Sequence, residues 1–174
     1  MPHIVLDCPS KDQLLCLSRA LHYEADTGLF YWKVDRSKKV RKGSKAGYIN
    51  KKGYVEIRFN YRSYQAHRIA WYIHTGVDPH TYQIDHINNI RMDNRIVNLR
   101  LATPAQNACN SKKSLHKTSR YKGVTWYKRK GKWQAQIRTQ GKNIHLGYYT
   151  DEYKAYMVYK AAAIKYHGEF ANFT

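Results

Sequence analysis

The sequence has few acidic residues and no long hydrophobic run. Only 12 Asp and Glu stand against 31 Lys and Arg in 174 residues, which gives a formal net charge of +19. So large an excess of one sign indicates a polyanionic partner. The apolar runs are too short to span a bilayer, and the first residues lack the basic and apolar segments of a secretion signal. We therefore expect a cytoplasmic protein without a membrane partner.

Cysteine is also scarce. Cys8, Cys16 and Cys109 are the only cysteines in the sequence, and no two of them form a CxxC pair. This pattern argues against a disulfide framework and against a zinc site built from cysteines. We expect reduced thiols.

The basic residues are concentrated at the two ends of the chain. Residues 1–66 carry 13 Lys and Arg against 6 Asp and Glu, and residues 111–174 carry 14 against 3. The segment 67–110 is nearly neutral, with 4 against 3, and holds four of the nine His. Since Tyr and Trp are interleaved with the cations, the pattern favours nucleic acid held by the flanks and chemistry in the centre.

Apolar periodicity predicts an α+β chain. Helical spacing predicts helices over 11–23 and from about Ala66 to a stop at Gly76. A loop or irregular hairpin is expected over 36–52. Thr103, Pro104 and Gln106 form a capping box with proline at the first helical position, which predicts a helix to about Asn110. Alternation predicts strands at 29–32, 53–59, 82–87 and around Leu99–Leu101.

The tail repeats the strand pattern and then changes to a helical one. Strands are expected around Val124–Trp126, over 133–138 and over 143–146, with Gly131 and Gly141 in the turns. Thr150 is the expected N-cap of a final helix that ends at Gly168. The tail therefore predicts a three-stranded antiparallel sheet packed on one helix, and the apolar-poor segment 111–119 predicts a linker before it.

A candidate catalytic cluster lies in the neutral centre. Asp85 and His86 stand side by side at a predicted strand end, and Asn107 lies in the first turn of the capped helix. Oxygen ligands from Asp85 and Asn107 would suit Mg²⁺ or Mn²⁺. His86 titrates in the range of a general base, and Asn98 could orient it. On residue types alone, an Asp-His pair in an Asn-rich loop is equally compatible with an ordinary turn.

The spacing of these residues resembles the HNH homing endonucleases of phages. The resemblance rests on Ala66-His67-Arg68-Ile69-Ala70-Trp71, Ile84-Asp85-His86-Ile87-Asn88, Asp93-Asn94-Arg95, Asn98-Leu99-Arg100 and Gln106-Asn107. It implies a ββα-metal core with His86 as general base, Asn98 as the orienting asparagine, and Asp85 and Asn107 as ligands of one Mg²⁺ or Mn²⁺ ion. It also leaves His67 mainly structural, while Arg68 could reach the scissile phosphate.

The tail resembles the APETALA/ERF-type DNA-binding domain of plant regulators. The similarity rests on Tyr121-Lys122-Gly123-Val124, Trp133-Gln134-Ala135-Gln136-Ile137-Arg138, His145-Leu146-Gly147-Tyr148-Tyr149 and Ala161-Ala162-Ala163. It implies that the exposed sheet face enters the major groove of double-stranded DNA. We expect Trp126 and Trp133 to support the core, with stacking on bases as the alternative. Lys128 and Arg129 are expected at phosphates. The outward positions are Thr125, Tyr127, Gln134, Gln136, Arg138, Asn143 and His145.

Together these features predict four segments and one main function. The segments are an N-terminal basic flank of helix and β-hairpin (1–65), the ββα-metal nuclease core (66–110), the linker (111–119) and the DNA-binding domain (120–174). The predicted function is metal-dependent cleavage of DNA in the host cytoplasm. The alternatives are a sequence-specific DNA-binding regulator with a non-functional nuclease core, or a basic RNA-binding protein.

Overall fold

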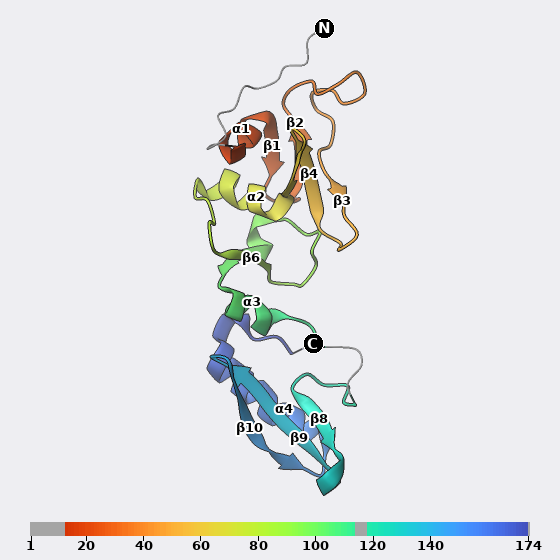
Figure 1. The fold of residues 1–174 in the computed structure, drawn as a ribbon, viewed down its shortest axis with the longest axis vertical. Coiled ribbons are helices and arrows are strands. Elements are labelled where there is room, and N and C mark those ends of the chain that lie inside the picture. Colours follow the sequence, from red (N-terminus) through yellow and green to blue (C-terminus); the bar gives the residue numbers. More distant parts are fainter. Residues whose placement is uncertain (1–12, 114–117, 174) are drawn as a thin grey trace. The chain divides into compact units, whose positions relative to one another are not determined.

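The computed structural model describes residues 13–113 and 118–173 (Figure 1). The chain divides into two compact units, Met1–Leu101 and Ala102–Thr174, and each has its own hydrophobic core. Within these described ranges, no helix combines the length and the apolar character needed to cross a membrane. The α+β character predicted from the sequence is confirmed.

The first unit combines α-helices with small sheets. β1 and β2 pair antiparallel, β4 pairs antiparallel with β3 on one side and β5 on the other, and β6 pairs with β7. The elements in chain order are α1 (Gln13–Ala20), β1 (Leu21–Glu24), β2 (Leu29–Trp32), β3 (Tyr48–Ile49), β4 (Val55–Phe59), β5 (Arg62–Gln65), α2 (Ala66–Thr75), β6 (Gln83–His86), the 3₁₀ helix η1 (Ile96–Asn98) and β7 (Leu99–Ala102).

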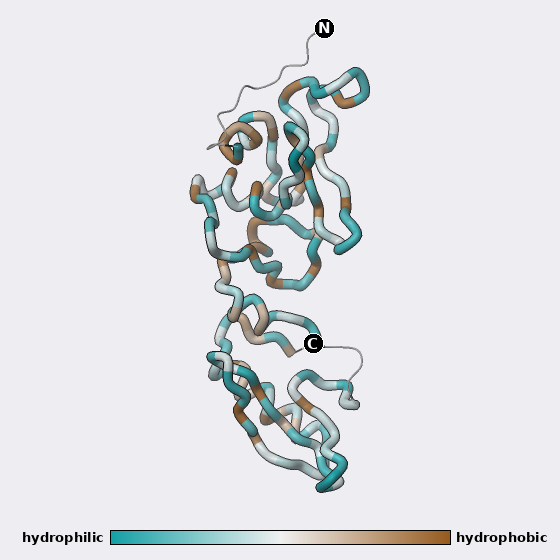
Figure 2. The backbone as a smooth tube through the Cα atoms, viewed as in Figure 1, coloured by the Kyte–Doolittle hydropathy of each residue, from teal (hydrophilic) through white to brown (hydrophobic). Residues whose placement is uncertain are grey.

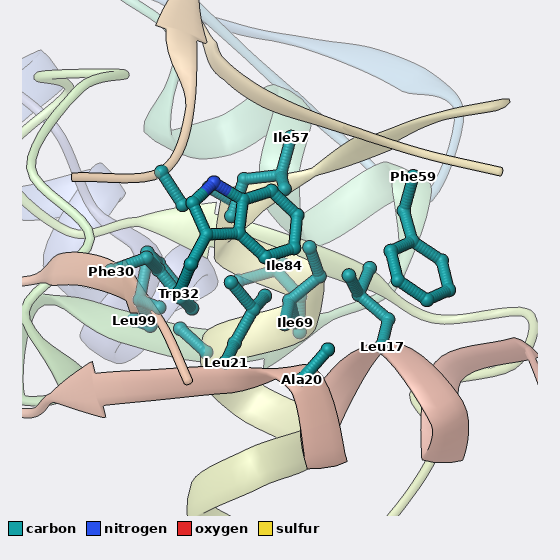
Figure 3. Close-up of a cluster of buried hydrophobic side chains, with 13 residues drawn as sticks. Leu17, Ala20, Leu21, Phe30, Trp32, Ile57, Phe59, Ile69, Ile84 and Leu99 are labelled. Carbon is teal, nitrogen blue, oxygen red and sulfur yellow. The ribbon is translucent and has the colours of Figure 1, made fainter. Parts of the chain in front are cut away.

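A single apolar cluster joins these elements (Figure 3). Ile84 of β6 and Leu99 of β7 are buried in it, so the strand pair that carries the candidate catalytic residues is anchored in the core. Removing such side chains from water is the main stabilising contribution of a core of this kind. The other elements contribute, among others, Leu17 of α1, Phe30 of β2, Ile57 of β4 and Ile69 of α2.

Helix α2 begins and ends where the sequence predicts. It spans Ala66–Thr75, and Gly76 follows in the left-handed conformation (φ 73°), with its N–H donating to the carbonyl of Tyr72. Glycine takes this conformation without the penalty that a Cβ would bring. The helix buries Ala66, His67 and Ile69 against the rest of the unit, so the predicted structural role of His67 agrees with its position.

Other parts of the first unit differ from the sequence prediction. The predicted helix over 11–23 is described as α1 to Ala20, and the chain then continues as β1. The strand β5 was not predicted; Asn60 and Tyr61, both with positive φ, make the turn that brings it against β4. Cys16 is disulfide-bonded, so the expectation of reduced thiols is wrong for this residue, whereas Cys109 is a free cysteine.

The second unit contains the predicted sheet and helix. Its strand order is β10-β9-β8, all antiparallel. The turn that follows β8 is basic and uniformly hydrophilic (Figure 2). The elements in chain order are α3 (Pro104–Asn110), β8 (Val124–Tyr127), the 3₁₀ helix η2 (Lys128–Lys130), β9 (Lys132–Thr139), β10 (Lys142–Tyr149), α4 (Glu152–His167) and the 3₁₀ helix η3 (Gly168–Phe170).

Helix α4 covers one face of this sheet. Ala135 and Ile137 of β9 are buried beneath Ala155 and Tyr159 of the helix. The N-cap is Asp151, whose side chain accepts from the backbone N–H of Lys154 at 2.6 Å, so the prediction of Thr150 as the cap is wrong by one residue. A carboxylate there also interacts favourably with the positive end of the helix dipole.

Helix α3 carries the predicted capping box. The Thr103 side chain accepts from the N–H of Gln106, and the Gln106 side chain accepts from the N–H of Thr103. The boundary between the compact units falls at Leu101 and Ala102, before this helix. The sequence-based division places the helix with the nuclease core and a linker at 111–119, of which 114–117 lie outside the described residues; that division stays a prediction.

His67 provides a test of the first unit. Burial, together with the neighbouring charges of His86 and Arg68, lowers the pKa of His67 to about 3. The unfolded chain therefore binds more protons than the folded one between about pH 6.5 and pH 3. We predict that the free energy of unfolding falls as the pH falls through this window, by at most about 1.4 kcal/mol per pH unit from this group.

The variant His67→Phe should lose that part of the pH dependence, because it keeps a neutral ring. Urea unfolding at several pH values, read on NMR amide signals of the first unit, measures it. His74→Phe, on the exposed side of the same helix, is the matched control. Equal slopes in the wild type and His67→Phe would contradict the prediction.

Candidate active site

Strand β6 ends on two adjacent polar residues that are both buried. Asp85 is 4% exposed and His86 6% exposed, directly after Ile84, which is packed in the core. The backbone N–H of Ile87 donates to the carbonyl of Asn98 at 2.9 Å, which joins the end of β6 to the segment that leads into β7. The pair is therefore held on a rigid part of the first unit, where a buried polar group needs specific partners.

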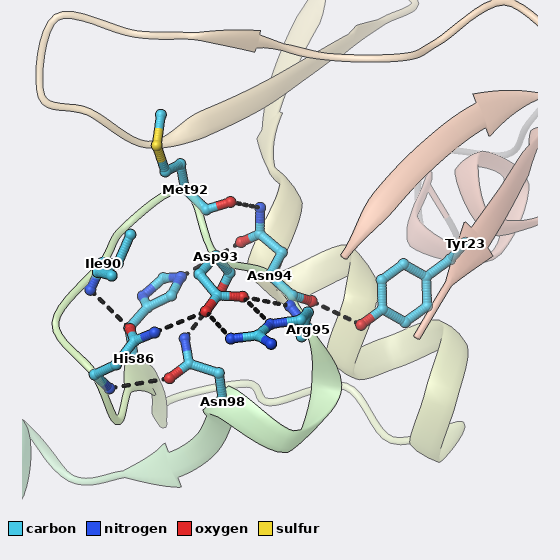
Figure 4. A network of polar contacts seen from close by, with 9 residues as sticks. Tyr23, His86, Ile90, Met92, Asp93, Asn94, Arg95 and Asn98 are labelled. Atoms are coloured by element: carbon cyan, nitrogen blue, oxygen red, sulfur yellow. Dashed lines mark hydrogen bonds and ion pairs between the residues drawn. The ribbon is translucent and has the colours of Figure 1, made fainter. Parts of the chain in front are cut away.

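The loop between β6 and β7 is closed by Asn98 (Figure 4). Its Oδ1 accepts from the backbone N–H of Asn88 at 2.9 Å, and its Nδ2 donates to the carbonyl of Asp93 at 2.8 Å. Asn98 thus connects the backbone at the two ends of the loop. That Asn98 orients His86 stays a prediction.

The Asp93 side chain also connects residues within the same loop. Its carboxylate accepts from Arg95 at 2.8 and 2.7 Å and from the amide of Asn88 at 2.7 Å. The hydrogen bonds from the Arg95 side chain and from Asn88 lower the pKa of Asp93 to about 2. The Asp93-Asn94-Arg95 motif therefore builds the loop, a function that the sequence did not assign to it.

His86 lies between Asn94 and a small aromatic group. Its Nε2 is 3.4 Å from Oδ1 of Asn94, and its ring centroid is 5.1 Å from that of His67 and 6.1 Å from that of Tyr54. Burial lowers the pKa of His86, against the opposing effect of the Asn94 contact and of Asp85. A lowered pKa keeps the imidazole neutral near pH 7, the form in which it can accept a proton.

Asn94 is oriented by its own contacts. Its Nδ2 donates to the carbonyl of Met92 at 3.3 Å, which directs Oδ1 toward His86. An amide oxygen only accepts, so this arrangement favours the tautomer of His86 with its proton on Nε2 and the lone pair on Nδ1. Asn94 is a site residue that sequence reasoning missed, although it lies in a motif that was noted.

Asp85 pairs with Arg100 on the neighbouring strand. Nε and Nη2 of Arg100 lie 2.9 and 2.8 Å from Oδ2 of Asp85. Both groups are largely buried, and a buried carboxylate is stabilised only when it is paired and hydrogen-bonded. Arg100 belongs to a motif noted in the sequence, but its pairing with Asp85 could not be predicted, because it depends on how β6 and β7 pair.

The hairpin of β1 and β2 makes hydrogen bonds to the loop between β6 and β7. The hydroxyl of Tyr23 donates to the carbonyl of Asn94 at 2.7 Å, and the N–H of Ile96 donates to the carbonyl of Ala25 at 3.1 Å. Gly28 (φ 72°) leaves no room for a side chain, since a Cβ there would lie 2.5 Å from the backbone nitrogen of Arg95. The basic flank is therefore part of the architecture of the site.

One predicted metal ligand, Asp85, lies next to His86. Among the described residues, no three His, Cys, Asp or Glu side chains form a cluster that could hold a metal ion. A carboxylate such as Asp85, completed by amide oxygens, water and phosphate, is the kind of set that Mg²⁺ accepts. Asn107, the other predicted ligand, lies on α3 in the second compact unit.

The Arg68 side chain is held by contacts within the protein. Its Nη1 and Nη2 donate to the carbonyls of Tyr82 and His80 at 3.0 and 3.2 Å, and Nη2 lies 3.6 Å from Asp78. These contacts tie α2 to the segment before β6. A role of Arg68 at the scissile phosphate stays a prediction.

The predicted DNA-reading residues of the tail share one face of the sheet. Gln136 pairs with His145 and Arg138 with Asn143, on the side opposite the buried Ala135 and Ile137. Thr125 lies opposite Gln134, and Tyr127 opposite Lys132. Lys128 and Arg129 are exposed in the turn after β8. The geometry brings these residues together; their contact with DNA stays a prediction.

A β-bulge adds Tyr148 to this face. The register of β10 shifts between His145 and Gly147, so Tyr148 pairs with Gln134 instead of turning inward. Its ring lies 4.5 Å from that of His145 and 5.3 Å from that of Tyr127. Strict alternation puts Tyr148 on the buried face, which is why the sequence analysis missed it.

The two tail tryptophans differ in environment. Trp133 packs against the small cluster of Val124, Ala135 and Ala155, as predicted for a residue that supports the core. Trp126 is 36% exposed and meets Trp133 edge-on, with ring centroids 5.0 Å apart. Core support therefore describes Trp133 better than Trp126.

Comparisons with known proteins show which proteins the chain is similar to. The family model of the HNH endonuclease matches residues 64–109. The chain is 31% identical over 125 residues to the uncharacterized HNH endonuclease L560 of Acanthamoeba polyphaga mimivirus, which covers 71% of the chain and 64% of that protein. No solved structure matches the chain.

Further similarity extends to plant and phage proteins. The AP2-like ethylene-responsive transcription factor TOE2 of Arabidopsis thaliana is 40% identical over 52 residues, 30% of the chain but only 11% of the plant protein. Protein 3.8 of Escherichia phage T7 is 34% identical over 82 residues, which cover 47% of the chain and 68% of the phage protein. The chain belongs to the same family as this phage protein, and its residues 64–109 are an HNH endonuclease domain.

Proposed function

We propose that the protein is a metal-dependent DNA endonuclease of the homing type, which hydrolyses phosphodiester bonds in double-stranded DNA at a recognised site. The observation that carries the proposal is the buried pair Asp85–His86, held by a closed loop inside an HNH endonuclease domain. A neutral imidazole beside a carboxylate is what hydrolysis by an activated water requires.

His86 is the general base of the proposed reaction. Its Nδ1 accepts the proton of the attacking water, because Asn94 favours the proton on Nε2. Burial of the ring keeps it neutral before the reaction. Asn98 keeps the loop, and with it the ring, in place through its bonds to Asn88 and Asp93.

Asp85 and Asn107 are the proposed ligands of one Mg²⁺ or Mn²⁺ ion. When bound, such an ion supplies positive charge that stabilises the phosphate in the transition state. Arg100 fixes the Asp85 carboxylate through a hydrogen bond from Nε and an ion-pair contact of Nη2 with Oδ2, so the side chain is already oriented.

DNA is held by the basic segments that precede and follow the catalytic pair in the sequence. Lys128 and Arg129 contact phosphates, and the face with Gln136 and Arg138 reads base edges in the major groove. Arg68 contributes to holding the backbone near the site. The similarity to the plant transcription factor supports DNA as the partner. It also supports the second candidate, a DNA-binding regulator whose nuclease core is inactive.

The first test removes the proposed base. His86→Ala should reduce the single-turnover rate of DNA cleavage about 10²–10⁴-fold, the usual contribution of a general base. Binding of the same DNA in EDTA should change little. The control His74→Ala removes an exposed histidine from α2 and should cleave like the wild type. A wild-type rate for His86→Ala, or a wild type that never cleaves, would favour the regulator.

The second test addresses the metal. Excess EDTA should abolish cleavage, and Asp85→Asn and Asn107→Ala should each require about tenfold more Mn²⁺ for half-maximal rate, since the first replaces a charged carboxylate by a neutral amide and the second removes an oxygen ligand. Asp85→Asn retains a group that can pack against Arg100. Asp35→Asn, at an exposed position, is the control. Unchanged Mn²⁺ titrations for both variants would reject the ligand assignment.

The third test separates reading of sequence from holding of phosphate. Arg138→Ala should weaken binding to target DNA by about 1–3 kcal/mol and binding to random DNA much less. Lys128→Ala should weaken binding to target and random DNA equally. It should also reduce the slope of the logarithm of the binding constant against the logarithm of the salt concentration by about one. Binding to target and scrambled duplexes at several salt concentrations measures both effects. Equal losses on both duplexes for Arg138→Ala would mean that this face does not read sequence.

A further inference from the structure

The helix that carries Asn107 is built into the second compact unit. Helix α3 packs against η3, which follows α4. Ala105, Ala108 and Cys109 of α3 line the same cavity of about 1050 Å³ as Ile137 and Tyr159 of the sheet-and-helix module. The helix is short, so its orientation depends on such contacts more than on its own hydrogen bonds.

Lys122 holds the end of α3 from one side. Its Nζ donates to the carbonyl of Cys109 at 2.8 Å and to the carbonyl of Ser111 at 2.5 Å. The last carbonyls of a helix lack partners within the helix, and a cation is favourable at that end of the dipole. Burial lowers the pKa of Lys122 to about 8.

Asn172 holds the same end from another side. It is 9% exposed, and its Nδ2 donates to the carbonyl of Asn110 at 2.8 Å and to its Oδ1 at 3.1 Å. Asn110 is itself only 3% exposed. A buried amide that bonds both a backbone and a side-chain oxygen of one residue fixes that residue in position and angle.

Lys122 and Asn172 are both attached to the sheet-and-helix module that carries the proposed DNA-reading strands. Lys122 precedes Gly123, whose carbonyl accepts from the N–H of Gln136 in β9 at 2.9 Å. Gly123 lies so close to α4 that a Cβ would come within 1.9 Å of Tyr159. Asn172 follows η3 at the end of α4. The hydrogen bonds at Cys109, Asn110 and Ser111 therefore attach the end of α3 directly to the sheet-and-helix module, in addition to the covalent connection through the predicted linker.

We infer that Lys122 and Asn172 are positioning residues that fasten α3 to the sheet-and-helix module, so that Asn107 and the DNA-reading strands move as one body. The relevance to metal binding rests on the proposed role of Asn107. Binding of DNA on the strands then also determines where Asn107 is presented. The sequence-based division instead separates the two functions by a linker at 111–119.

Hydrogen exchange of the full chain tests the inference without measuring activity. Lys122→Met and Asn172→Ala should each speed exchange of the amides at the end of α3 about 10–100-fold, while β9 amides keep their protection. Lys122→Arg, which keeps a cationic donor, should restore most of the protection. Lys154→Met, on the exposed side of α4, should change neither. Unchanged exchange in α3 for both variants would overturn the inference.

A second measurement tests whether Lys122 affects the metal requirement of cleavage. Lys122→Met should raise the Mn²⁺ concentration for half-maximal cleavage several-fold at saturating DNA, and Lys154→Met should not. A Mn²⁺ requirement unchanged by Lys122→Met, despite faster exchange in α3, would overturn the link to Asn107. A wild type without metal-dependent cleavage would reject the proposed function and leave the exchange result standing.

Discussion

The side-chain amide of Asn98 bonds the backbone of Asn88 and of Asp93, and the rest of the site depends on this closure. It brings the two ends of a polar loop together directly after the buried pair Asp85–His86. With the loop closed, Asn94 reaches the imidazole and Asp93 reaches Arg95. A side chain that satisfies two backbone groups at once stabilises a loop that has little apolar surface of its own.

Burial determines the electrostatics of this region. Asp85 is paired with Arg100, whereas burial lowers the pKa values of His86 and His67 and favours their neutral forms. Two adjacent residues on one strand thus lie in different environments. The N-terminal hairpin contributes by covering the loop through Tyr23 and Gly28.

Local signals in the sequence predicted the elements that depend on local chemistry. The capping box at Thr103, the helix stop at Gly76 and the alternation in β9 each required only neighbouring residues. Features set by pairing at a distance were not predictable. Arg100 meets Asp85 through strand register, and Tyr148 faces outward because of a bulge. Asn98 was selected from spacing, but its partners required the folded loop.

The attachment of α3 to the second unit has a consequence for how such proteins exchange parts. A chimaera that takes a new DNA-binding module at the polar segment after Ser111 would keep the native α3 and lose the Lys122 and Asn172 side chains that grip its last turn. A junction between Leu101 and Ala102 would transfer α3 together with the Lys122 and Asn172 side chains that bond its last turn. Recombination between genes of related proteins should therefore leave its crossovers near residue 101 more often than in the predicted linker at 111–119.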